Sequence, residues 1–216
     1  MEAKNNVSVG GLPPRSLFRS LGPLVRTVGE MSPCPYLVFA NEGYREVLLN
    51  WLASAKRVGV SNVVVIAYSR SLYEELHRTG IKSVFVPLAA GKQNLWWRLF
   101  VFQAMCLAGI DFIHCDADAV LLRDPGNYLA RFPDADFIVS QGTVHPPEEA
   151  KSRGFVVCMG FFLLRGTLSA LTMLAKALDT IGSTKTDRAS VNSVLPTRKI
   201  VEEATDWELT QLGYSF

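Results

Sequence analysis

The chain has 216 residues, of which 49% are hydrophobic and 19% are charged, and its formal net charge is +2. These values predict one globular domain with a sizeable core and exclude a disordered chain. No basic run stands out, so we expect no nucleic-acid partner.

The four cysteines are Cys34, Cys106, Cys115 and Cys158. They have no Cys-x-x-Cys spacing and three have apolar neighbours, which favours buried free thiols over zinc ligands or disulfides. No apolar run approaches the roughly 20 residues of a membrane span. The N-terminus shows no signal-peptide pattern, so these residues do not identify the cellular compartment.

In chain order, residues 1–30 predict a loose tail and a short helix that Pro23 shortens or kinks. The main domain is expected over residues 31–216. Its first half predicts strands at 36–40, 63–67, 84–88 and 112–115, with helices that carry Val47 to Ala55 and span 71–78 and 95–107. This alternation predicts an α/β fold, with a mostly parallel sheet and helices on both faces.

The second half predicts a short strand at 136–140, a polar loop at 141–153 and an apolar strand at 155–165 that Gly160 interrupts. Helices are expected at 168–181 and 187–195. Residues 199–216 are too mixed to assign.

The most informative motif is Asp116-Ala117-Asp118, which follows the buried strand 112–115. Carboxylates after a buried strand are costly unless they are paired or bound to a metal ion. Strand alternation would project Asp116 and Asp118 to one side, where both could bind Mg²⁺ or Mn²⁺. Asn41 also follows a strand, so both segments are expected at one ligand-binding edge.

Two alternatives stay open for this motif. The pair could simply end the strand as a cap or turn. A phosphohydrolase with an aspartyl nucleophile also uses such a pair, and it would need a downstream lysine, for which Lys151 is available, and a second acidic pair. Asp134-Ala135-Asp136 resembles that second pair, but it precedes a strand instead of following one.

The chain resembles the nucleotide-diphospho-sugar transferases of glycosyltransferase family 77. The matching residues are Asn41 to Arg45, Leu48 to Trp51, Trp97-Arg98, Asp116 to Asp118, Arg123 to Pro125, Gly160 to Phe162, Arg165 to Thr167, Asp187 and Asn192. The resemblance implies a GT-A fold, Mn²⁺ or Mg²⁺, a UDP-sugar donor, a glycan or protein acceptor, and retention at the anomeric carbon. It also implies residence in the Golgi lumen.

The resemblance also implies roles for individual residues. Asn41, Gly43 and Tyr44 would hold the nucleotide base, although Tyr44 could instead pack on the following helix. Arg98 would reach the donor, with a solvated side chain or a partner of Asp111 as the alternative. Asp116 and Ala117 would contact the nucleotide, and Asp116 with Asp118 would hold the metal ion. Gly160 would open space beneath the sugar, and Asp187 with Arg188 would act at the reacting centre, although Asp187 could instead cap a helix.

Three features depart from the family pattern. Cys158-Met159 stand where the family has Asn and then Thr or Ser, and Arg188 replaces Gln. The last histidine is His145, so the third metal ligand would be water, Asp206 or a residue outside the chain. These departures keep open a catalytically degenerate nucleotide-sugar-binding module.

Overall fold

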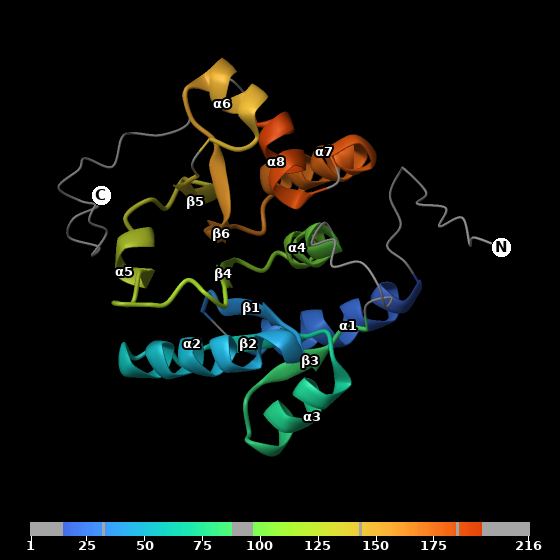
Figure 1. Ribbon diagram of the computed structural model, residues 1–216, viewed down its shortest axis with the longest axis vertical. Helices are drawn as coiled ribbons and strands as arrows, with labels where there is room; N and C mark the ends of the chain where they lie inside the picture. Colours follow the sequence, from blue (N-terminus) through green and yellow to red (C-terminus); the bar gives the residue numbers. More distant parts are fainter. Residues whose placement is uncertain (1–14, 32, 88–96, 143, 185, 196–216) are drawn as a thin grey trace.

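The computed structural model describes residues 15–31, 33–87, 97–142, 144–184 and 186–195. A six-stranded sheet in the order β3-β2-β1-β4-β6-β5 lies at its centre (Figure 1). The strands are β1 (Tyr36–Ala40), β2 (Val63–Ala67), β3 (Ser83–Phe85), β4 (Phe112–Asp116), β5 (Phe137–Gln141) and β6 (Val157–Leu164). The predictions for residues 1–14, 95–96 and 199–216 concern segments outside the described part.

The sheet is mostly parallel, as predicted. β1 pairs in parallel with both β2 and β4, and β3 pairs in parallel with β2. β6 runs antiparallel to both of its neighbours, β4 and β5. The carboxyl ends of β1, β2 and β4 therefore meet at one edge, where open α/β sheets bind ligands.

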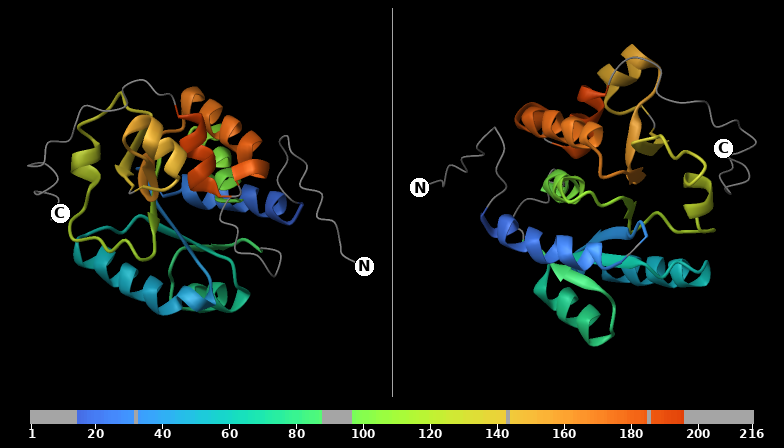
Figure 2. Two further views of the ribbon diagram at one scale, coloured as in Figure 1. Left: turned by 45° about the horizontal axis from the view of Figure 1, so that its top comes forward. Right: turned by 180° about the vertical axis from the view of Figure 1, so that it is seen from behind.

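Helices cover both faces of the sheet, because the strand residues alternate between two apolar clusters. The helices on one face are α2 (Arg45–Arg57) and α3 (Arg70–Arg78), and those on the other are α1 (Arg15–Gly29), α4 (Arg98–Leu107), α7 (Leu168–Thr184) and α8 (Asp187–Val194). Figure 2 shows α7 and α8 beside α4, on the side of the sheet away from α2. No helix among the described residues has the length and apolarity that crossing a bilayer requires.

Some predicted elements differ from the structure. A helix, α6 (Pro147–Arg153), occupies much of the segment that was predicted as a polar loop, and a short helix α5 (Gly126–Leu129) was not predicted. The signals for α6 were present: a proline at its start, Glu148 and Glu149 in its first turn, and Gly154 in the left-handed conformation at its end. β6 continues through Gly160 instead of breaking there.

Candidate active site

The carboxyl end of β4 presents Asp116 and Asp118. β4 ends at Asp116, and the amide of Ala119 donates a 3.0 Å hydrogen bond to the Asp116 carbonyl, so Asp118 lies in a turn. The prediction that strand alternation puts both carboxylates on one side assumed that Asp118 lies in the strand, and that assumption was wrong. The Asp116 side chain is partly buried, Asp118 is exposed, and Ala117 between them is buried in the core.

Helix α2 fixes this turn. The buried Trp51 indole donates a 3.0 Å hydrogen bond from Nε1 to the Ala119 carbonyl. Ser54 Oγ, one turn further along α2, accepts a 3.2 Å bond from the Leu121 amide. Trp51, which belongs to the Leu48–Trp51 segment of the family resemblance, and Ser54 thus hold the acidic turn in place.

Arg98 is the buried centre of the site, with 4% of its surface exposed. Its Nη1 lies 2.7 Å from Asp116 Oδ1, and its Nε and Nη2 lie 2.9 and 2.7 Å from Asp187 Oδ2. This cation therefore joins the end of β4 to the start of α8. It is neither solvated nor paired with Asp111, which pairs instead with Arg165 at 2.9 Å.

His114 is a further neighbour of Arg98. The sequence did not predict this residue in the site. It is fully buried on β4, and its Nε2 lies 3.2 Å from Arg98 Nη1 and 3.1 Å from Asp116 Oδ1. Position 114 shares a strand face with position 116, so alternation in β4 could have identified it.

These contacts shift the ionisation of the cluster. Burial opposes ionisation of Asp116, but its contacts with His114 and with the Arg98 cation together outweigh burial, and the pKa of Asp116 lies well below its usual range. Burial lowers the pKa of His114 and outweighs the contact with Asp116, which raises it; the Arg98 cation acts in the same direction as burial. Burial also works against the charge of Arg98, but Asp187 and Asp116 more than compensate and raise its pKa. Asp116 is therefore ionised and His114 neutral at neutral pH.

The start of α8 carries Asp187 and Arg188. The helix cap is Thr186, whose hydroxyl accepts a 3.1 Å bond from the Ala189 amide, so Asp187 does not serve as the cap. Asn192 fastens α8 to β6 by exchanging hydrogen bonds with the Val157 amide and carbonyl at 2.9 and 3.1 Å. The Asp187 carboxylate is thereby held at the site with 4% of the residue exposed.

Gly160, Cys158 and Arg188 form the wall beside Asp116. A Cβ at Gly160 would lie 3.0 Å from Asp116 Oδ2 and 3.5 Å from Cys158 Sγ, so glycine keeps that carboxylate oxygen uncovered. The Arg188 Nη2 donates to Cys158 Sγ at 3.5 Å. Cys158 and Arg188, which both depart from the family pattern, therefore contact each other beside Asp116, while Met159 lies in the core.

The loop after β1 lies at the same edge. Phe39 is in register with Asp116, so Asn41 and Asp118 both follow the paired residues by two positions. Asn41 Oδ1 accepts a 3.2 Å bond from the Tyr44 amide and would be 3.4 Å from a Cβ at Gly43. Tyr44 is 47% exposed, which leaves its ring available to a ligand.

A divalent cation is compatible with these residues, although the described part of the chain contains no cluster of three or more His, Cys, Asp or Glu side chains suited to a metal ion. Mg²⁺ often binds one or two carboxylates and takes its other ligands from water and substrate phosphates. Asp118 is exposed, and Asp116 Oδ2 has no hydrogen-bond partner among the described residues. His145 is exposed on the segment before α6, and Asp206 lies outside the described residues.

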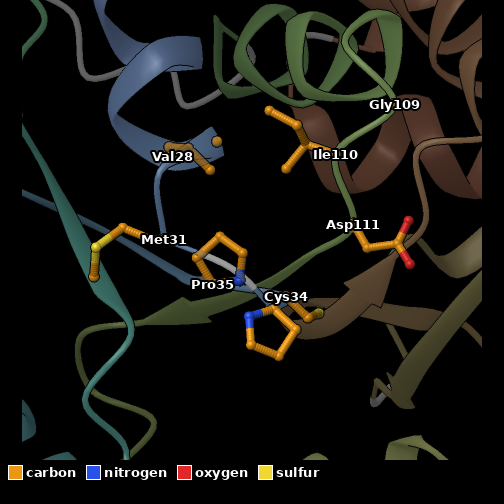
Figure 3. A pocket seen from close by; sticks show the side chains of 9 residues that line it. Val28, Met31, Cys34, Pro35, Gly109, Ile110 and Asp111 are labelled. Atoms are coloured by element: carbon orange, nitrogen blue, oxygen red, sulfur yellow. The ribbon is translucent and has the colours of Figure 1, made fainter.

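A pocket of about 270 Å³ lies at the opposite edge of the sheet (Figure 3). Its wall includes Cys34 and Pro35, which precede β1, and Asp111, which precedes β4. Each of these strands has five residues, or about 15 Å at the usual rise per residue, so the pocket is distinct from the acidic turn. Asp111 is already bound by Arg165 and by the Gly166 amide.

Comparison with known proteins identifies the family of the chain. Residues 58–202 match the model of the nucleotide-diphospho-sugar transferase family, and the chain belongs to that family. It is 26% identical over 121 residues to arabinosyltransferase XEG113 of Arabidopsis thaliana, which covers 51% of this chain and 19% of that protein. The chain thus spans about a fifth of the length of this curated relative.

Two solved structures share the fold. The bifunctional glycosyltransferase WbbM aligns with a TM-score of 0.59 at 14% identity, covering 77% of this chain and 38% of that one. The galactosyltransferase LgtC, solved with donor and acceptor sugar analogues, aligns with a TM-score of 0.52 at 11% identity, covering 73% and 69%. The GT-A fold and the resemblance to family 77 are confirmed at this level.

Proposed function

We propose that the chain transfers a sugar from a UDP-sugar donor to an acceptor hydroxyl, with the help of Mn²⁺ or Mg²⁺ and with retention at the anomeric carbon. The observation that carries the proposal is the placement of Asp116 and Asp118 at the carboxyl edge of a GT-A sheet, with Asp116 Oδ2 left uncovered by Gly160. Asp118 and this oxygen would hold the cation. Once bound, the cation would neutralise charge that develops on the leaving diphosphate.

The residues of the chain would share the remaining work. The exposed Tyr44 ring would stack on the base, and Asn41 with Gly43 would shape the loop that holds it. Arg188, whose described side-chain partner is the Cys158 sulfur atom, would donate to the diphosphate. Asp187, held by Arg98, would stabilise positive charge on the sugar ring. The acceptor would lie over residues 141–153, which include α6.

Calorimetric titration of UDP in Mn²⁺ and in EDTA tests nucleotide and metal together. We expect binding that depends on metal, and Asp118→Ala should abolish it. The matched control is Asp134→Ala, an exposed aspartate in a second Asp-Ala-Asp triplet, which should leave UDP affinity unchanged. Unaltered affinity in Asp118→Ala would show that the metal assignment is wrong.

A panel of UDP-sugars, with release of UDP as the readout, then identifies the donor. Release of UDP from one or a few of the donors supports the transferase. The binding-module alternative is favoured by the contact between Cys158 and Arg188 and predicts metal-dependent UDP binding with no turnover of any donor. Phosphate release from a phosphomonoester without UDP affinity would support the hydrolase instead.

A further inference from the structure

His114 lies where an apolar side chain would be expected. Its ring is fully buried and is surrounded by Phe39, Phe102 and Phe162, at centroid distances of 5.2, 5.3 and 5.0 Å. A polar ring in an aromatic environment costs free energy unless its nitrogen atoms are hydrogen-bonded. The hydrogen bonds of the two ring nitrogen atoms therefore explain how a histidine is tolerated at this position.

The neighbours of each nitrogen atom define which one carries the proton. Nδ1 lies 3.2 Å from the Leu37 carbonyl of β1, which can only accept a hydrogen bond, so Nδ1 carries a proton. Nε2 lies 3.2 Å from Arg98 Nη1, which can only donate, and 3.1 Å from Asp116 Oδ1, which can only accept. Full burial among aromatic rings disfavours a doubly protonated, charged ring, so with the proton on Nδ1 the Nε2 atom accepts from Arg98. The 3.1 Å approach of Nε2 to Asp116 Oδ1 then brings two acceptors together around a shared donor.

This arrangement fixes the rotation of the guanidinium group. One Nη1–H of Arg98 points to Asp116 and the other to His114, while Nε and Nη2 point to Asp187. Without the acceptor at Nε2, one buried N–H would lose its partner, and the guanidinium could turn away from either carboxylate.

We propose that His114 is a positioning residue of the donor site: it donates a hydrogen bond to the Leu37 carbonyl of β1 and accepts one from Arg98, and so orients Arg98 to hold Asp116 and Asp187 together. This inference rests on the proposed transferase site for its effect on activity, but the geometry it describes belongs to the folded chain alone. Supporting contacts of this kind around a site typically change metal affinity or activity by 10–100-fold when they are removed.

The test uses His114→Phe in the full chain, because phenylalanine keeps the aromatic packing and removes both nitrogen atoms. The matched control is Phe162→Leu, which perturbs the same cluster but leaves every contact of Arg98 in place. We expect His114→Phe to lower metal-dependent UDP affinity or the kcat of UDP release at least about tenfold. Phe162→Leu should lower the melting temperature with much smaller effects on both. If His114→Phe and Phe162→Leu lower UDP affinity and kcat equally, the proposal is overturned.

A second readout does not depend on activity. Nitrogen-15 spectra of the three histidine rings should show one neutral ring with a proton on Nδ1, and His114→Phe should remove that signal. The same variant should accelerate hydrogen exchange at the buried Arg98 Nε–H. A ring proton on Nε2, or unchanged exchange at Arg98, would overturn the positioning role even if UDP binds. Absence of UDP binding in the wild-type chain would count against the proposed function and leave this readout intact.

Discussion

Replacing Arg98 with methionine removes a buried cation that contacts two carboxylates. Asp187 is 4% exposed and its Oδ2 accepts from both Nε and Nη2, so the variant leaves a buried, uncompensated charge. Breaking a buried pair by removing one partner costs about 3–5 kcal/mol. Asp116 adds less, because its side chain is 36% exposed and water can solvate it.

A double-mutant cycle isolates the pair. Arg98→Met should lower the free energy of unfolding by about 3–5 kcal/mol, a large fraction of the 5–15 kcal/mol of a typical domain. Asp187→Asn should cost less, because Arg98 keeps Asp116 as a partner. In Arg98→Met/Asp187→Asn the buried charge is gone from both sides, so the loss should fall at least about 2 kcal/mol short of the sum of the single losses.

Urea unfolding followed by tryptophan fluorescence measures these differences, since the chain has four tryptophans. Arg45→Met is the matched control, because water solvates the Arg45–Glu75 pair and its loss should lower the free energy of unfolding far less than Arg98→Met does. If the losses of Arg98→Met and Asp187→Asn simply add, the two side chains are not coupled and this account of the site is incorrect.

Three further outcomes follow from the geometry. Gly160→Ala puts a Cβ 3.0 Å from Asp116 Oδ2, so metal-dependent UDP affinity should fall at least several-fold in calorimetry; unchanged affinity would mean that this oxygen does not face the ligand. Gly166→Ala puts a Cβ 2.4 Å from the backbone carbon of Gly109, so chemical unfolding should show a loss of about 2–3 kcal/mol, and a loss under about 0.5 kcal/mol would contradict the close approach. Burial raises the pKa of Cys106 and of Cys115 from the ordinary thiol value to about 12. The stability contributed by these thiols is complete below pH 9 and is lost as pH rises toward 12, so a thiol-to-serine pair of variants should flatten the alkaline decline in melting temperature.

The sequence predicted the local and periodic parts of the fold well. Continuous apolar runs such as Val63–Ala67 have one interpretation in an alternating chain, a strand that helices cover on both faces. The antiparallel direction of β6 left no such signal, because a buried strand has the same pattern in either direction. α6 was not predicted because consecutive prolines such as Pro146 and Pro147 are typical of loops as well as of helix starts.

The candidate site was predictable in its residue types but not in its pairing. Asp116 and Asp118 were identified because carboxylates after a buried strand are unusual. The contact of Arg98 with Asp187 joins residues 89 positions apart, and nothing in either segment specifies it. The contact between Cys158 and Arg188 also joins distant positions, and it links two departures that looked independent in the sequence.

The charges of this cluster give a physical reason to expect a cation. Asp116, Asp118 and Asp187 contribute three carboxylates, against two guanidinium groups from Arg98 and Arg188, so the diphosphate of a nucleotide sugar would approach a net negative site. At separations on the order of 8 Å, one like charge costs the ligand about 0.5–2 kcal/mol, depending on solvent exposure. Asp118→Asn removes that charge together with a proposed metal ligand. UDP affinity in EDTA should therefore rise about two- to tenfold in this variant, while affinity in Mn²⁺ should fall, both measured by calorimetry. If UDP affinity changes in the same direction under the two conditions, Asp118 does not act on the diphosphate through its charge, and the charge argument is refuted.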